Sequence, residues 1–122
     1  MDEVGLVLVL TTFDDPQDAA RVGRKLVEDR LAACATRVPG ATATYWWQGQ
    51  IEESSEILLL LKTTAERHDA LIETLRELHP YEVPEIVSFI PTSTNKAYVR
   101  WLAESLASAS PSGGGRRPGG AT

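Results

Sequence analysis

The sequence of 122 residues has a single cysteine, no long apolar run and no excess of basic residues. Because Cys34 is its only thiol, the chain cannot form an intrachain disulfide, and nothing in it indicates an oxidising compartment. No apolar stretch approaches the ~20 residues that a membrane-spanning helix needs. The N-terminal segment lacks the basic start and small-residue cleavage site of a signal peptide. We therefore expect a cytoplasmic protein without a membrane partner.

The charge balance argues against a nucleic-acid partner. The net charge is −5, and since two of the twelve basic residues are Arg116 and Arg117, residues 1–109 carry ten basic against seventeen acidic side chains. An acidic domain repels phosphate backbones. We predict one domain over residues 1–109, followed by a disordered tail over 110–122, because that segment is rich in Gly, Ser and Pro and has little apolar area to bury.

Apolar periodicity alternates between strand and helix patterns along the domain. The predicted order is strand, helix, two strands joined by a tight turn at Gln48-Gly49, helix, strand and a last helix. The elements are expected at 4–12, 16 to about 33, 34–47 with a kink at 38–40, 50–64, 64–79, 85–91 and from 94 or 95 onward. This order predicts an α+β fold of the ferredoxin-like type, β-α-β-β-α-β with an additional C-terminal helix and an antiparallel sheet.

The two central strands are longer than a domain of this size needs. Residues 41–64 should therefore project as a hairpin with exposed edges, carrying the apolar side chains of Tyr45, Trp46 and Trp47. Natural proteins cover such edges, commonly with another subunit. We expect an obligate oligomer with these three aromatic residues at its interface.

Several segments together resemble the CutA divalent-cation tolerance family, in that family's order and spacing. They are LVEDRLAAC (26–34), VPG (38–40), YWWQGQIE (45–52), SEILLLLKT (55–63), HPYEVPEI (79–86) and YVRWL (98–102). The resemblance implies a homotrimer similar in architecture to PII signalling proteins, with clefts between subunits. It also implies a link to divalent cations, copper in particular, with no obligatory cofactor. Thr36, Ala43 and Gln48 depart from the family's usual residues.

Three side chains are candidate metal ligands. Cys34 offers a soft thiolate for a cation such as Cu(I), and His79, held at a helix end before Pro80, offers an imidazole. Glu85 could add an oxygen ligand. Each also has a structural interpretation: a small buried thiol, a histidine bonded to a free carbonyl, and a solvated glutamate. No local spacing typical of a metal site links them.

A second set of side chains could line a cleft between subunits. Lys62, Tyr81, Glu82, Tyr98 and Trp101 are the candidates for binding a small-molecule effector. Tyrosine hydroxyls and a lysine ammonium suit a small anion. Because Lys62 ends a leucine run, its charge should have a partner.

We therefore expect a non-enzymatic protein of the divalent-cation tolerance class that binds a metal or a small effector. The alternative is a PII-like small-molecule sensor without a physiological metal. A phosphate-binding glycine loop would favour nucleotide sensing, and the domain has none. An enzyme using Cys34 with His79 needs a base and an oxyanion site that the sequence does not show. RNA-binding domains of the same strand order display aromatics on a basic sheet, unlike these aliphatic strands.

Overall fold

The computed structural model describes residues 5–107, so the predicted tail at 110–122 lies outside the described residues. Its elements are β1 (Leu6–Phe13), α1 (Pro16–Glu28), β2 (Cys34–Trp47), β3 (Gln50–Thr64), α2 (Ala65–Leu78), β4 (Ile86–Phe89) and α3 (Lys96–Ala107). This confirms the predicted order and the additional C-terminal helix. No helix within residues 5–107 is long and apolar enough to cross a bilayer.

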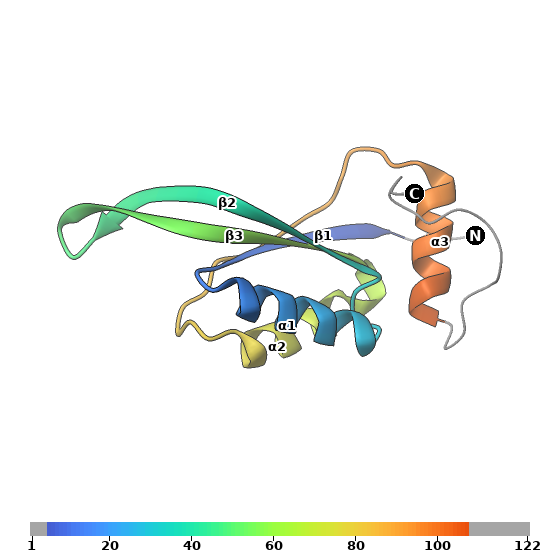
Figure 1. Ribbon diagram of the computed structural model, residues 1–122. Coiled ribbons are helices and arrows are strands. Elements are labelled where there is room, and N and C mark those ends of the chain that lie inside the picture. The colour runs from blue at the N-terminus through green and yellow to red at the C-terminus, as the bar shows by residue number, and fades with distance from the viewer. Residues whose placement is uncertain (1–4, 108–122) are drawn as a thin grey trace.

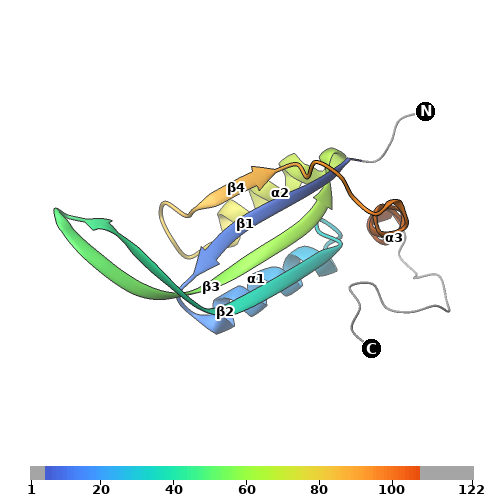
Figure 2. The same ribbon diagram turned by 90° about the horizontal axis from the view of Figure 1, so that it is seen from above.

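The four strands form one antiparallel sheet in the order β2-β3-β1-β4. Helices α1 and α2 lie side by side against one face of this sheet (Figures 1 and 2). Helix α3 lies at the end of the sheet that is opposite to the tip of the long β2-β3 hairpin (Figure 1). The hairpin extends beyond β1 and the helices, as predicted, but the projecting part is shorter than 41–64, because residues 57–64 of β3 pair with β1 within the sheet.

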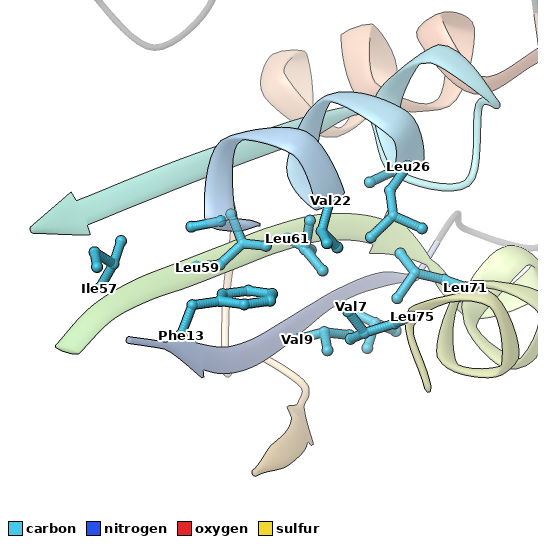
Figure 3. Packing of buried hydrophobic residues seen from close by; sticks show 12 residues of the cluster. Val7, Val9, Phe13, Val22, Leu26, Ile57, Leu59, Leu61, Leu71 and Leu75 are labelled. Atoms are coloured by element: carbon cyan, nitrogen blue, oxygen red, sulfur yellow. The ribbon is translucent and has the colours of Figure 1, made fainter. Parts of the chain in front are cut away.

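The hydrophobic core lies between the sheet and the two helices (Figure 3). Alternate residues of β1 and β3 point toward the helices because successive side chains of a strand point to opposite faces. The buried core residues include Val9, Phe13, Leu59 and Leu61 from the strands and Val22, Leu26, Leu71 and Leu75 from the helices. Each of these eight is fully buried, so this face of the sheet is completed by the chain itself.

The opposite face of the sheet carries neither α1 nor α2, and we call it the open face. Directly paired residues of an antiparallel ladder point to the same face. Two rows on the open face are Thr36–Leu60–Leu10–Val87 and Cys34–Lys62–Leu8–Phe89. The outer side chains Val87 and Phe89 are 45% and 42% exposed, and the inner leucines are half-buried. The chain thus leaves an apolar sheet surface in contact with water.

Helix α1 ends earlier than the sequence pattern predicts. We expected it to reach about Ala33, but its last residue is Glu28, and Arg30 adopts a left-handed backbone conformation with φ of 59°. The amide of Leu31 then donates to the Leu26 carbonyl, which closes the helix in the manner of a Schellman motif. Apolar periodicity continues through the turn, because Leu31 and Ala32 still pack toward the core, and this made the helix look longer.

A β-bulge interrupts β2 where the kink was predicted. The register shifts between Val38 and Ala41, and Gly40 within the bulge has φ of +83°. Two residues of β2 therefore oppose one of β3, which moves the rest of the strand by one position. Since a slip of one residue turns a side chain to the other face, the bulge decides which face Cys34 occupies.

Candidate functional site

Lys62 and Cys34 are directly opposite each other on β3 and β2 and share the open face. The Lys62 ammonium donates a hydrogen bond to Thr36 Oγ1, and its Nζ lies 3.6 Å from Cys34 Sγ. Thr36 follows Cys34 by two residues, so the strand period brings both side chains to the same side. We expected the charge of Lys62 to have a partner, and the structure gives it two neutral ones, the hydroxyl of Thr36 and the thiol of Cys34.

Helix α3 adds aromatic side chains to this pair of strands. The rings of Tyr98 and Trp101 stack with centroids 5.6 Å apart. Burial raises the pKa of the Tyr98 phenol above its ordinary value, and nearby Cys34 raises it further. The phenol therefore stays protonated at neutral pH. Leu102 anchors the helix by packing with Leu6 in a small second core.

We call Cys34, Thr36, Lys62, Tyr98 and Trp101 the lysine cluster. Within residues 5–107 the side-chain ion pairs join Arg21 to Asp18, Arg24 to Glu28, Lys25 to Asp29 and His68 to Asp69. Lys62 takes part in none of these pairs, so its charge meets only neutral groups in the described part of the chain. An ammonium has three donors, and it attracts anions and repels cations. The charge of Lys62 therefore favours an anion over a cation at this place.

His79 lies in the interior, at the opposite end of β1. Its Nδ1 accepts a hydrogen bond from the backbone N–H of Tyr81 at 3.2 Å. Nε2 must then carry the proton, which it donates to the Thr12 carbonyl at 2.9 Å, with Thr11 Oγ1 at 3.1 Å. The ring also stacks on Phe13 with centroids 4.3 Å apart. Both ring nitrogens are bonded, so a metal ion would have to displace one of these contacts.

The protonation state of His79 follows from its burial. Desolvation lowers the pKa of the imidazole below its ordinary value of 6.5, and the bond to the Thr12 carbonyl opposes this shift, as do the charges of Asp18 and Asp14. The ring is therefore neutral at physiological pH. The expected hydrogen bond to a free carbonyl is present, but the carbonyl belongs to β1 and not to the helix that His79 ends.

Tyr81 lies beside His79, with ring centroids 4.8 Å apart, and Glu85 lies near it at the base of the hairpin. The pKa of the Tyr81 phenol is raised by burial first and then by the charges of Asp14 and Glu56. The pKa of Glu56 is raised by partial burial and by the nearby charge of Glu85. Glu82 is exposed. Asp14, Glu56 and Glu85 thus form an acidic surface around the Tyr81 phenol, separate from the lysine cluster.

The structure thus divides the predicted ligands differently from the sequence. It gathers Lys62, Tyr98 and Trp101 with Cys34, and it places Tyr81 and Glu82 elsewhere. Cys34 lies beside Lys62, which pairs with Leu8 of β1, whereas His79 bonds to Thr11 and Thr12 of the same strand. Leu8 is three to four residues from Thr11 and Thr12, so Cys34 and His79 are separated by roughly 10–13 Å along β1. Within residues 5–107 no three His, Cys, Asp or Glu side chains converge on one point. The set Cys34, His79 and Glu85 stays a prediction that needs more than one chain.

Two features were not found from the sequence. Thr36 was noted only as a departure from the family pattern, although its spacing from Cys34 places it on the same face. His68 was not among the candidate residues, yet its side chain is only 27% exposed and its Nε2 lies 2.6 Å from Ser88 Oγ. The predicted interface aromatics Trp46 and Trp47 are 71% and 59% exposed on the hairpin, where a single chain leaves them in water.

Comparisons with known proteins point to one family. The family model of the CutA1 divalent ion tolerance protein matches residues 7–105. The divalent-cation tolerance protein CutA of Escherichia coli strain K12 / DH10B is 41% identical over 100 residues, which are 82% of this chain and 89% of that protein. The fold resembles the divalent cation tolerance protein of Thermus thermophilus, with a TM-score of 0.75, 44% identity, and coverage of 80% of this chain and 94% of that one. It also resembles CutA of Archaeoglobus fulgidus, described as periplasmic, with a TM-score of 0.78, 26% identity, and coverage of 83% and 98%.

Proposed function

Because this chain belongs to the CutA1 divalent ion tolerance family, we propose that it is a cytoplasmic, homotrimeric and non-enzymatic member of that family. In this proposal the lysine cluster binds a small anionic effector in a cleft between subunits. Binding changes the contact surface of the trimer, which passes the signal to a partner in the response to metal ions. A PII-like small-molecule sensor without a physiological metal would use the same effector site.

One observation carries the effector proposal: the ammonium of Lys62, half-buried on an apolar sheet face, meets only a hydroxyl and a thiol. A charge that is partly removed from water without a counter-charge is unfavourable. A bound carboxylate or phosphate would supply that counter-charge and accept a third hydrogen bond. The protonated phenol of Tyr98 could donate to the same ligand, and the Tyr98–Trp101 stack offers an apolar wall.

The open face supports the trimer. Leu8, Leu10, Leu58 and Leu60 lie half-buried on this face, and Val87 and Phe89 extend it along the β4 edge, so a contiguous apolar surface is left uncovered in one chain. Both β2 and β4 are edge strands with unpaired backbone groups. Copies of the chain that pack their open faces together would cover this surface. The number three comes from the family resemblance.

Copper binding is the second candidate, because the family is defined by tolerance to divalent cations. The partly exposed thiol of Cys34 is a suitable ligand for a thiophilic ion. The neighbouring ammonium of Lys62 opposes a cation at this place, and His79 is fully bonded inside the chain. A site made of Cys34, His79 and Glu85 would therefore have to be assembled across subunits.

Calorimetric titration can separate the two candidates. Wild type and Lys62→Gln should be titrated with inorganic phosphate, citrate and ATP, and with Cu(II), at equal oligomer content. Lys25→Gln is the matched control, since Lys25 lies on the outer surface of α1 in an exposed ion pair. We expect at least one anion to bind wild type and the control, and to bind Lys62→Gln at least tenfold more weakly. Equal affinity for every anion in all three proteins would refute the anion site.

The copper candidate has its own variants. If Cys34 and His79 are ligands, Cys34→Ala and His79→Ala should each lower the stoichiometry or affinity for Cu(II), while the anion titration of His79→Ala stays as in wild type. If neither variant changes Cu(II) binding, the metal set is wrong.

Light scattering on the same samples tests the trimer, and a stable folded monomer at micromolar concentration would overturn it.

A further inference from the structure

Ser88, His68 and Asp69 form a hydrogen-bonded chain on the helix-covered side of the sheet, where α2 meets the edge strand β4. Ser88 Oγ lies 2.6 Å from His68 Nε2, and His68 Nδ1 lies 2.9 Å from Asp69 Oδ1. We propose that Ser88 is an activated nucleophile with His68 as its base, and that the groove around them takes up acyl groups from small activated esters.

The fold places these residues without strain. His68 is the fourth residue of α2, and Ser88 pairs with Val9, whose side chain points to the helix-covered face. The edge of the sheet therefore directs the serine toward the helix, and the imidazole bridges the two elements. Serine, base and carboxylate within hydrogen-bond reach are the arrangement that nucleophilic catalysis requires.

A groove of about 610 Å³ runs along this junction, which is enough room for a small ligand. Its walls are formed by His68, Ile72, Arg76, Glu82, Val83, Pro84, Ile86 and Ser88. The apolar members offer contact to an acyl chain. His68, Ile72 and Arg76 are spaced by four residues and share one face of α2, which puts Arg76 roughly 12 Å along the helix axis from His68. A guanidinium at that distance suits the far end of a ligand and not the reacting carbonyl.

The chemistry is acyl transfer to oxygen. As Ser88 Oγ attacks the ester carbonyl, its proton moves to His68 Nε2, and the carbonyl electrons form an oxyanion. Collapse of the oxyanion breaks the bond to the alcohol or phenol, which leaves with the proton from His68 or as an anion. Because β4 is an edge strand, some of its backbone N–H groups point away from β1 and are free of that partner strand. Such groups are suitable donors to the oxyanion.

Two features limit the reactivity to activated esters. The Asp69 carboxylate is fully exposed, so it orients the imidazole only weakly. The groove is open to water. We therefore expect stoichiometric acylation of Ser88, in addition to the binding role of the lysine cluster, which lies on the other face of the sheet.

A fluorophosphonate probe tests this site in the full chain, because it labels activated serines by displacement of fluoride and spares thiols such as Cys34. We expect one label per chain, located on Ser88 by peptide mass spectrometry. Ser88→Ala should abolish labelling, and His68→Gln, which can still bond to Ser88 but cannot act as a base, should slow it about a hundredfold. Asp69→Asn should slow it only a few-fold.

Ser55→Ala is the matched control, since Ser55 is an exposed serine on the hairpin, and it should label as wild type does. Lys62→Gln should also label normally, which separates this site from the effector site. The proposal is overturned if wild type is not labelled, if the label resides on another residue, or if His68→Gln reacts as fast as wild type. Circular dichroism of each variant shows whether the fold is retained.

Discussion

The two faces of the sheet are built from the same strands, yet the chain completes only one of them. On β3, Leu59 and Leu61 are fully buried under the helices, whereas Leu58 and Leu60 on the open face stay half-buried. The four consecutive leucines thus alternate between the two faces: the odd-numbered ones are in the core, and the even-numbered ones are on the open face. One face provides the stability of the single chain, and the other offers an apolar surface with one lysine in it. We therefore expect the fold of one chain and the assembly of several chains to depend on separate residues.

The largest loss of unfolding free energy should come from a substitution on the helix-covered face. Leu61→Ala removes a fully buried side chain, and we expect it to lower the free energy of unfolding by about 3 to 4 kcal/mol. Leu60→Ala, one residue away on the open face, should cost only about 1 kcal/mol in the isolated chain. Denaturant unfolding of both variants checks this. Equal losses at a protein concentration where wild type is monomeric would mean that the two faces are equally covered by the chain.

A charge on the open face should act on assembly and not on the fold. Leu10 lies between Leu60 and Val87, so Leu10→Glu would bury a carboxylate if copies pack on this face. We expect the subunit contact to weaken by about 3 kcal/mol. Light scattering should then report a smaller particle with an unchanged circular dichroism spectrum. Val83→Glu is the control, because Val83 is 87% exposed away from this face. If Leu10→Glu keeps the mass of wild type, the open face is not the subunit contact.

His79 should link stability to pH. Its pKa is lowered in the folded chain, so the unfolded chain binds a proton near 6.5 and the folded chain binds it only at lower pH. The stabilisation is therefore fully present above about pH 6.5 and is lost as the pH falls toward the folded-state pKa. His79→Gln should lower the unfolding free energy by about 2 kcal/mol at about pH 7.5, because buried hydrogen bonds are disrupted.

The measurement is the difference in unfolding free energy between wild type and His79→Gln at several pH values. Carboxylates titrate in both proteins and cancel to first order in this difference. The difference should shrink as the pH falls from about 7.5 to about 5. A constant difference over that interval would show that His79 does not titrate with a lowered pKa.

Apolar periodicity and turn residues were enough to predict the element order, the sheet and the long hairpin. The end of α1 was missed because Arg30, and not a glycine, takes the left-handed position. The pairing of Cys34 with Lys62 could have been obtained by counting back from the Gln48-Gly49 turn. Without the bulge, Cys34 would have faced Thr63, on the covered side; the one-residue shift brings it to Lys62. Predicting this pairing therefore requires knowing that the bulge inserts one extra residue into β2.

Contacts between elements that are distant in sequence could not be predicted in the same way. His79 bonds to Thr12 and stacks on Phe13 because α2 ends beside the end of β1, and His68 reaches Ser88 because α2 crosses behind an edge strand. Residue types and local spacing do not contain these helix–sheet distances. The sequence could thus nominate candidate residues, while their grouping in space required the packed structure.

The smallest effect is expected at the hairpin tip, which belongs to neither face. Gly49 has φ of +81°, so Gly49→Ala should cost about 1 kcal/mol by steric strain. Gly5→Ala is the control: the added Cβ would lie 3.7 Å from Ala65 Cβ, an ordinary contact, and we expect little change. Thermal unfolding measures both. If the tip stays in water, the loss should be the same at all protein concentrations. A loss that grows with concentration would instead place the tip, with its neighbour Trp47, against another copy of the chain.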